Sequence, residues 1–341
     1  MKIIIYSKHL VSMDGVGNSS IYFENLFKSF SEVSLVANYS NIDRVLNFKE
    51  YYKKHSPNNI LFYHYSIEDP NIKSLLELKF KKRIIYFHGI TPPKFFEPET
   101  EIFNSCKRGL KDINVISNFD LYISNSSDSK NQFLDRINQN FISCPKFINM
   151  PPIDLFSEKK KVKKSKSLKS GLNFYYCGTL AKHKNINSLL DLFNKNYNNQ
   201  INLSIFTSFS KEECLNFLGE YKYTEYLENG INIFNKLEDE NMNNLIKKMD
   251  CFITLSLHEG FCIPLFNAIN NFNPGLSFPL KCLEDYFPKE YQYLTIGDNL
   301  EIIQKKYQNN LKNIEKFRDY IKNKAKGYTN TGLDLILKTI E

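Results

Sequence analysis

Short, wholly apolar runs alternate with longer amphipathic stretches along most of this 341-residue chain. Strand-like runs in the first half are KIIIY, VSLVA, NILFYH, RIIYFH and DLYIS. Helix-like stretches between them are SSIYFENLFKSF, PNIKSLLELKF and SDSKNQFLDRI. Strands that are apolar on both faces and alternate with helices indicate βαβ units. We therefore expect a parallel sheet covered by helices on both sides.

The same alternation restarts after residue 170. Its strand-like runs are LNFYYC, INLSIF, GINIF, CFITLS and PGLSF, and its helix-like stretches are NINSLLDLF, DENMNNLIKKM and PLFNAINNF. Because 341 residues exceed what one ordinary core holds, the repeat predicts two α/β domains. Each is expected to be a doubly wound, Rossmann-like domain that binds ligands at the carboxyl ends of its strands.

The segment SEKKKVKKSKSLKSG separates the halves and carries seven lysines from Lys159 to Lys169. We expect domains at 1–157 and 171–318, a linker at 158–170 and a helical segment at 319–341. From about Glu301 the spacing of Ile303, Tyr307, Leu311 and Ile314 predicts a helix with one apolar face. The formal charge of +8 favours anionic partners in general, whether phosphates, acidic lipid or nucleic acid. The lysines of the linker are expected to attract an anionic membrane surface, while a merely solvated linker stays open.

The start of the chain, MKIIIYSKHL, is too short in apolar residues for a signal peptide, and no run of about 18 apolar residues follows. We therefore expect a cytoplasmic protein, or one peripheral on the inner face of the cytoplasmic membrane. The seven cysteines form no CxxC pair and no cluster with zinc-ligand spacing. This pattern predicts buried thiols in a reducing compartment.

Two stretches of the second half combine a strand end with chemically useful residues. In CFITLSLHEGFCIPLFNAI, Glu259 follows a strand and a helix is expected to begin near Pro264. The backbone N–H groups before that helix favour an anion such as a diphosphate. In NFYYCGTLAKHKN, cationic side chains follow the strand that ends at Gly178. A solvated glutamate and solvated loop lysines remain the alternatives when each stretch is taken alone.

Two stretches of the first half are weaker candidates. His88 follows the strand RIIYFH directly, and His64 and Ser66 are placed similarly after NILFYH. A lone histidine is more often structural, so both interpretations stay open. Gly15 and Gly17 after the first strand suit a backbone-only phosphate contact, although Ser20 interrupts the dinucleotide fingerprint.

Taken together, HEGFCIPLFNAI, GTLAKHKN, FHGITPPKFF, SNSSDSKNQF and DGVGNS resemble the retaining glycosyltransferases of the GT4 family. The similarity is closest to bacterial members that build O-antigen and capsule polysaccharides. It runs over nearly the whole chain, with the motifs in the order of that family. The resemblance implies a GT-B fold, in which two Rossmann-like domains face each other across a cleft and a C-terminal helix packs back toward the first domain.

The resemblance also implies site roles. Glu259 matches the acid near the donor sugar, His88 faces that sugar from the first domain, and Lys184 contacts the diphosphate. His183 stands where the family has arginine, and Asn267 stands where the family has a second acid at the ribose. The catalytic set is therefore Glu259, His88 and Lys184. The donor-binding set is Gly15, Gly17, Gly178, Thr179, His183, Lys184, Phe261, Cys262, Ile263 and Asn267.

These assignments predict a retaining, metal-independent hexosyltransferase. It would move a hexose from a GDP- or UDP-sugar to a saccharide acceptor, expected to be lipid-linked, in surface polysaccharide biosynthesis. Positive charge on the leaving diphosphate and exact placement of the sugar supply the rate enhancement. No metal and no cofactor are expected, because no DxD follows an apolar strand. Glu238, Asp239 and Glu240 instead open a polar helix, where acids suit the dipole.

Two other functions are weighed. His183 and Asn267 also suit a catalytically weak or inactive sugar-nucleotide-binding subunit of a polysaccharide-assembly complex. A nucleic-acid-binding protein is disfavoured, because the lysines lack interleaved aromatic residues and no recognition fold is apparent. Nucleic acid is therefore not an expected partner.

Overall fold

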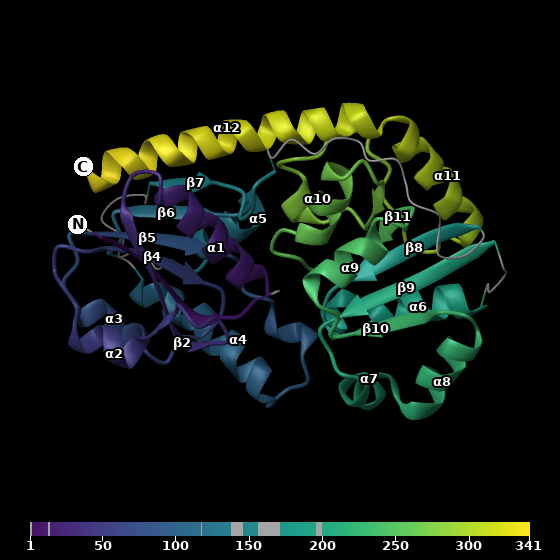
Figure 1. Ribbon diagram of the computed structural model, residues 1–341, viewed down its shortest axis with the longest axis horizontal. Helices are drawn as coiled ribbons and strands as arrows, with labels where there is room; N and C mark the ends of the chain where they lie inside the picture. The colour runs from purple at the N-terminus through teal and green to yellow at the C-terminus, as the bar shows by residue number, and fades with distance from the viewer. Residues whose placement is uncertain (1, 13, 117, 138–145, 156–170, 196–199) are drawn as a thin grey trace. The chain divides into compact units, whose positions relative to one another are not determined.

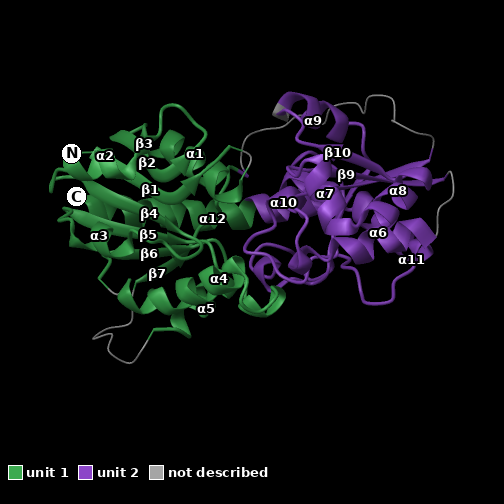
Figure 2. Cartoon of the chain, turned by 90° about the horizontal axis from the view of Figure 1, so that it is seen from below, with its two compact units in different colours: residues 1–154, 323–341 green, residues 155–322 purple. Residues whose placement is uncertain are grey.

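The computed structural model describes residues 2–12, 14–116, 118–137, 146–155, 171–195 and 200–341. The chain divides into two compact units (Figure 2). Unit 1 comprises residues 1–154 and 323–341, and unit 2 comprises residues 155–322. The expected linker at 158–170 lies outside the described residues, so its role stays a prediction.

A parallel sheet forms the centre of unit 1 (Figure 1). Within the described residues it has seven strands in the order β3-β2-β1-β4-β5-β6-β7, and all adjacent pairs are parallel. The strands are β1 (Lys2–Leu10), β2 (Glu32–Ser40), β3 (Leu46–Asn47), β4 (Ile60–Tyr65), β5 (Lys82–Phe87), β6 (Leu121–Ser124) and β7 (Phe147–Asn149). The five apolar runs of the first half are thus confirmed as β1, β2, β4, β5 and β6.

Helices cover both faces of this sheet. On one face, Phe23 and Phe27 of α1 and Ile336 of the C-terminal helix α12 pack with buried strand residues such as Tyr86. The opposite face is covered by α2 to α5 and the short turn η2. The helical elements are α1 (Gly15–Phe27), α2 (Phe48–Lys53), α3 (Ile72–Glu77), η1 (Pro93–Phe95), α4 (Glu101–Asp112), η2 (Ile113–Val115) and α5 (Ser127–Leu134), together with α12 (Ile314–Ile340), which belongs to unit 1 from residue 323 on.

Unit 2 repeats the plan with a smaller parallel sheet. Its described strands follow the order β10-β9-β8-β11-β12, again with parallel pairs. The strands are β8 (Leu172–Cys177), β9 (Ile201–Thr207), β10 (Asn232–Asn235), β11 (Cys251–Ile253) and β12 (Gly275–Leu276). The helical elements are η3 (Lys182–Lys184), α6 (Ile186–Lys195), α7 (Lys211–Leu218), α8 (Glu220–Glu228), α9 (Asp239–Ile246), α10 (Ile263–Asn270), η4 (Lys281–Leu283) and α11 (Leu300–Lys312).

Several local expectations in unit 2 are confirmed. Helix α10 begins beside Pro264, which occupies its first turn, and α9 opens at the acidic stretch. Ile303 and Tyr307 of α11 are buried in the core, and Leu311 packs against it. Three residues of the predicted apolar face therefore anchor α11. The fourth, Ile314, begins α12 instead, because α11 ends at Lys312.

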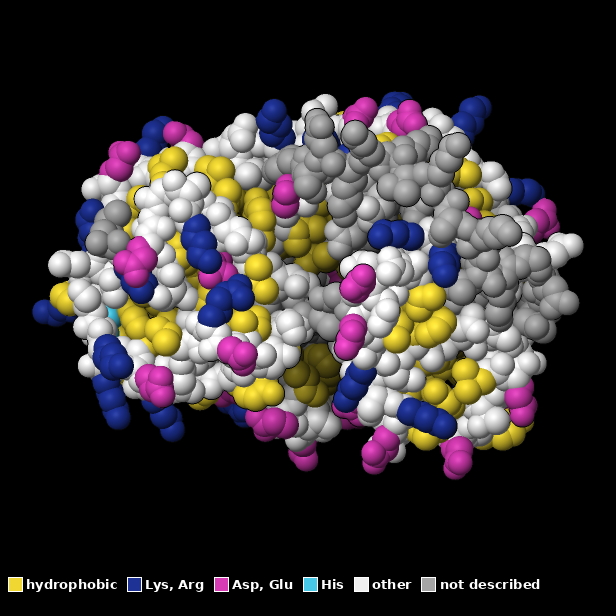
Figure 3. Space-filling model, viewed as in Figure 1, with side chains coloured by type: hydrophobic (Ala, Val, Ile, Leu, Met, Phe, Trp, Pro, Cys, Tyr) yellow, Lys and Arg dark blue, Asp and Glu magenta, His cyan; other side chains and the backbone are white. Residues whose placement is uncertain are grey.

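The described surface is mixed in charge. Lysine and arginine side chains are interspersed with acidic ones on the face shown in Figure 3, so the described residues gather no single basic patch there. None of the described helices combines the length and apolar character that a membrane span requires.

Two glycines of α12 sit in opposite environments. A Cβ added at Gly332 would lie 2.7 Å from Sδ of Met150, a fully buried residue of unit 1. A Cβ added at Gly327, which is exposed, would meet nothing within 4 Å. Gly332 therefore allows α12 to approach the core closely, whereas Gly327 only weakens the helix.

This contrast predicts opposite effects of two matched substitutions. Gly327→Ala should raise the free energy of unfolding by about 0.5–1 kcal/mol, because alanine restricts the unfolded chain and favours the helix. Gly332→Ala should instead lower it by about 1–3 kcal/mol through overpacking against Met150. Calorimetry of the intact chain measures both. Equal stabilisation by the two variants would show that α12 does not pack on Met150.

Candidate active site

Two loops meet at the carboxyl edge of the unit 2 sheet. Strands β8 and β11 are neighbours, with Cys251 paired to Phe174. The loop after β8 carries η3, and the loop after β11 carries Glu259. The Leu257 backbone N–H donates to the His183 carbonyl oxygen at 2.7 Å, which joins the two loops. Parallel pairing thus brings the two candidate stretches together.

A buried ion pair reinforces this junction. Lys184 Nζ lies 2.7 Å from Glu259 Oε2, and the two side chains are 19% and 12% exposed. Burial alone would raise the pKa of Glu259, but the charge and hydrogen bond of Lys184 outweigh it, so the pKa is lowered. Glu259 is therefore a carboxylate at neutral pH, held in one place.

Two hydroxyls behind Glu259 were not identified from the sequence. Ser256, fully buried, hydrogen-bonds Glu259 and helps to lower its pKa. The Thr254 hydroxyl lies 2.8 Å from the Ser256 hydroxyl, which extends the chain of hydrogen bonds. The available signal was the pair of hydroxyl residues, two positions apart, at the end of an apolar strand.

His183 is a neutral group in this site. Burial, followed by the charge of Lys184, lowers the pKa of its imidazole to about 4. At pH 7 the His183 imidazole therefore carries no charge. Lys184 is left as the cation directly paired with Glu259.

Gly178 and Thr179 shape the start of the same loop. The Tyr176 hydroxyl donates to the Thr179 carbonyl oxygen at 2.8 Å, and the Gly178 N–H donates to the Phe206 carbonyl oxygen at 3.0 Å. A Cβ at Gly178 would lie 2.8 Å from the Tyr176 hydroxyl oxygen. Only glycine fits this position without moving a buried tyrosine.

Helix α10 begins just after Glu259 with unusual backbone geometry. Cys262 caps it in the left-handed region, with φ at 65°, and its side chain is buried. Phe261 stacks on Phe266 with ring centroids 4.2 Å apart, so both ends of the turn are anchored. Burial, and then the charge of Glu259, raises the pKa of the Cys262 thiol. Ile263 is the first helical residue, and Asn267 is exposed one turn later.

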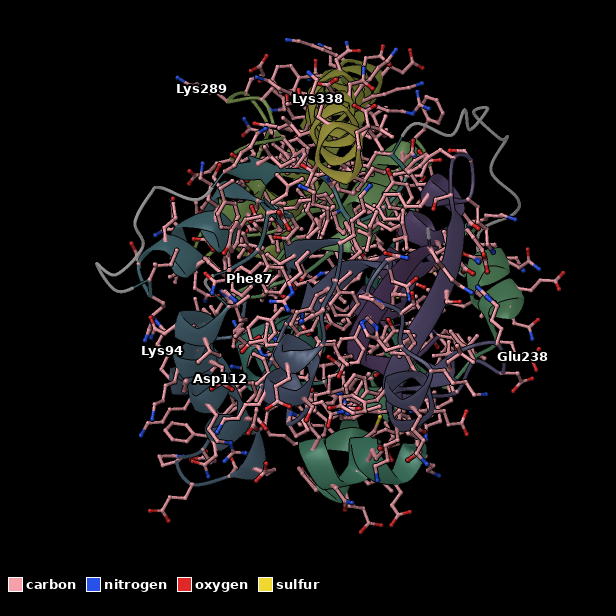
Figure 4. The ribbon with its side chains drawn as sticks, turned by 90° about the vertical axis from the view of Figure 1, so that its left-hand side faces the viewer. Phe87, Lys94, Asp112, Glu238, Lys289 and Lys338 are labelled. Carbon is pink, nitrogen blue, oxygen red and sulfur yellow. The ribbon has the colours of Figure 1, made fainter. Side chains whose placement is uncertain are left out.

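In unit 1, His88 lies directly after β5. Phe87, labelled in Figure 4, ends that strand, and the His88 N–H donates to the Tyr65 carbonyl oxygen at 2.9 Å. The His88 carbonyl oxygen accepts from Asn125 Nδ2 at 3.0 Å and from Ser129 Oγ at 3.4 Å. Its backbone is therefore fixed by the element that follows β6.

The rest of the His88 loop is clamped by α5. Gln132 donates to the Ile90 carbonyl oxygen and accepts from the Ile90 N–H, each at 2.7 Å. Gly89 has φ at 79°, and a Cβ there would lie 2.7 Å from Ser129 Oγ. Asn125, Ser129 and Gln132 belong to the quoted motif SNSSDSKNQF, but their individual roles were not foreseen. A single glutamine in a helix has no sequence pattern that would identify such a clamp in advance.

Gly15 and Gly17 lie at the start of α1. Gly17 is required by packing, since a Cβ there would overlap the Val11 carbonyl oxygen. Asp14 caps the helix, and its carboxylate accepts from the Val16 N–H at 3.3 Å and also from Gly15. These donors already have an acceptor within the chain, and the phosphate contact stays a prediction.

Comparison with known proteins adds the family. Residues 157–327, half of the chain, match the model of "Glycosyl transferases group 1". The chain belongs to this family. No curated protein sequence matches this glycosyltransferase.

Solved structures place the fold. HepE of Anabaena in complex with UDP and glucose shares 12% identity, covers 99% of this chain and 100% of its own, and has a TM-score of 0.72. A UDP-forming α,α-trehalose-phosphate synthase of Burkholderia xenovorans shares 11% identity, with 99% and 98% coverage and a TM-score of 0.67. At these identities the likeness shows the fold. Together with two parallel α/β units, it makes this glycosyltransferase a GT-B protein.

The candidate residues of the glycosyltransferase thus fall into two groups. The group from Gly178 to Asn267 lies in unit 2, as does the Lys184–Glu259 pair, while His88, Gly15 and Gly17 belong to unit 1. Within the described ranges, no three His, Cys, Asp or Glu side chains form a group suited to a metal ion.

The buried histidines predict that the free energy of unfolding decreases in acid. Burial lowers the pKa of His88 to about 3 and that of His64 well below its usual value, and His183 falls to about 4. Unfolded histidine titrates near 6.5, so below that pH the unfolded chain binds protons that the folded chain refuses. Stability should be full above pH 6.5 and fall toward pH 4, by at most about 1.4 kcal/mol per pH unit for each histidine.

Urea unfolding of the intact chain at pH 7.5, 6.5 and 5.5 measures this effect. The variant His88→Asn is the matched comparison, since it removes one titrating ring and should give a shallower decline. Urea midpoints that stay constant between pH 7.5 and 5.5 would contradict the assigned neutral state of these histidines.

Proposed function

We propose that this glycosyltransferase is a retaining, metal-independent hexosyltransferase that uses a nucleotide diphosphate sugar as its donor. The observation that carries the proposal is the Lys184–Glu259 ion pair at the carboxyl edge of the unit 2 sheet. Ligands of doubly wound sheets bind at this edge, so a cation and an anion are held where a charged substrate arrives.

The two charges suit the two ends of the scissile bond. Lys184 has three N–H donors, and Glu259 accepts one of them, so the remaining N–H groups can donate to a departing diphosphate. Glu259 is fixed by Ser256 and Lys184, and its carboxylate can accept from sugar hydroxyls. Charge that is already in place stabilises a developing anion without reorganisation.

Several features support the choice of donor. HepE binds UDP and glucose in a chain of the same fold, and the Burkholderia synthase is UDP-forming. Asn267 is exposed one turn into α10. In the motif it occupies the position at which the family contacts the ribose. We therefore propose a UDP-hexose first and a GDP-hexose second.

The proposal of metal independence rests on a positive charge that the protein itself provides. Lys184 supplies at the diphosphate the positive charge that a bound Mg²⁺ or Mn²⁺ supplies in other enzymes. His183 adds a neutral imidazole rather than a second cation. No cofactor is included in the proposal.

The acceptor is proposed to be a saccharide, lipid-linked, in surface polysaccharide biosynthesis on the inner face of the cytoplasmic membrane. The support is the motif resemblance together with the lysines from Lys159 to Lys169, which favour an anionic lipid surface. Nucleic acid is not proposed as a partner.

A second function rests on two replacements. His183 is neutral where the family has a charged arginine, and Asn267 is an uncharged amide where the family has an acid. These two replacements favour an alternative function, that of a catalytically weak or inactive sugar-nucleotide-binding subunit of a polysaccharide-assembly complex.

One experiment separates these functions. After exhaustive EDTA treatment, nucleotide release from UDP- and GDP-hexoses should persist, and transfer to a saccharide acceptor should retain the anomeric configuration. Calorimetry detects binding and NMR of the product gives the anomer. Binding without turnover supports the alternative. Activity that only Mn²⁺ or Mg²⁺ restores contradicts metal independence.

A second prediction concerns two lysines of η3. Lys184→Ala should lower kcat by about 30- to 1000-fold, because a charge-assisted contact to the developing diphosphate contributes about 2–4 kcal/mol. Lys182→Ala should be mild, since that side chain is exposed. Steady-state kinetics with the same donor compares the two variants. A larger loss for Lys182→Ala would overturn the assignment.

A stability control accompanies this comparison. Removing Lys184 leaves the Glu259 carboxylate buried and unpaired, which costs about 3–5 kcal/mol in such pairs. The double variant Lys184→Met/Glu259→Gln removes both charges and should recover most of that stability. It should remain inactive, which separates the catalytic loss from unfolding.

A further inference from the structure

His64 and His88 form a hydrogen-bonded pair in unit 1. His64 of β4 pairs in register with Tyr86 of β5, so His88 lies two residues further on and on the same face of the sheet. His64 Nδ1 lies 2.7 Å from His88 Nε2, and the rings stack with centroids 5.0 Å apart.

The two rings have different surroundings. His64 is 2% exposed and lies among the rings of Phe23, Phe62 and Tyr86. Its second ring nitrogen, Nε2, is buried without a hydrogen-bond partner. The second ring nitrogen of His88, Nδ1, forms no hydrogen bond with the described residues and is not among the buried unpaired atoms. Of the two rings, only that of His88 therefore has a second nitrogen that is not buried without a partner, although the residue as a whole is 9% exposed.

A single proton in the shared hydrogen bond decides both tautomers. Burial keeps both imidazoles neutral at pH 7 by lowering their pKa values. If His88 Nε2 donates, His64 must carry its proton on Nε2 and bury an unpaired N–H group. If His64 Nδ1 donates, the buried Nε2 is only a bare lone pair. Unpaired buried N–H groups are rarer than unpaired acceptors, so the second arrangement is favoured.

We infer that His64 is a positioning residue that fixes His88 as the Nδ1–H tautomer, so that His88 donates a hydrogen bond to a ligand oxygen. This role rests on the proposed function, in which His88 faces the donor sugar. The ligand atom that it recognises must be an acceptor, such as a sugar hydroxyl or phosphate oxygen. A protonated amine at that position would have no lone pair to offer and would be excluded.

The first test needs no ligand. Full-length protein labelled with ¹⁵N in histidine reports, through two-bond ¹H–¹⁵N correlations, which ring nitrogen carries the proton. The signals of His88 are assigned by their loss in His88→Asn. We expect His88 to be the Nδ1–H tautomer in the wild type. An Nε2–H tautomer of His88 would overturn the inference.

Substitutions at His64 test the dependence. In His64→Asn the amide Nδ2 replaces the donor at Nδ1, so His88 should keep its tautomer. In His64→Phe the donor is lost, and His88 should shift toward the Nε2–H tautomer that a free histidine side chain favours in water. Phe23→Leu is the matched control, because it changes packing on His64 but leaves the hydrogen bond. A shift of the same size in Phe23→Leu would contradict the role of the hydrogen bond.

The second test uses UDP release from UDP-glucose. His64→Phe should lower kcat/KM by about three- to ten-fold, the effect of one neutral hydrogen bond, while His64→Asn stays within about two-fold of the wild type. Adding His64→Phe to His88→Phe should cause no further loss, because residues that act through each other are not additive. Additive losses would overturn the inference. Absence of UDP release from the wild type would count against the proposed donor, and the tautomer measurement would still decide the role of His64.

Discussion

Parallel pairing of buried strands is the constraint on which both units depend. Most connections within each unit return through a helix, and because the strands are parallel their carboxyl ends meet at one edge of the sheet. The register of β8 with β11 joins Lys184 to Glu259, which are 75 positions apart in the chain. The register of β4 with β5 likewise stacks His64 on His88, which are 24 positions apart. Chemistry in each unit is therefore assembled by strand order.

Stability alone does not explain the ion pair of unit 2. Removing two charges from water costs several kcal/mol per ion, and their mutual attraction barely repays it. The structure offsets this cost with additional hydrogen bonds, since Ser256 also supports Glu259. A lysine held in this way is in place before any ligand arrives. Such preorganisation is what stabilisation of a leaving diphosphate requires.

Both sites rely on backbone held in restricted conformations. Gly89 adopts a left-handed conformation, and a Cβ there would also crowd Ser129. Gln132 holds the following residue, Ile90, through both its N–H and its carbonyl oxygen. Cys262 adopts a similar conformation although it carries a side chain, at a cost on the order of 1 kcal/mol. Burial of its thiol and the stacking of Phe261 on Phe266 compensate for this strain. Loops whose backbone is held in this way place their side chains accurately.

The sequence by itself determined the alternating elements, the two parallel sheets, the start of α10 beside Pro264 and the family, because these depend on local periodicity, turn chemistry and motif order. The tertiary structure alone decided which side chains meet. That His183 joins Leu257, that Ser256 supports Glu259, and that Gln132 clamps Ile90 all depend on which strands are neighbours. Local periodicity specifies a strand but not its neighbour in the sheet, since a wholly apolar strand can pair equally well on either edge.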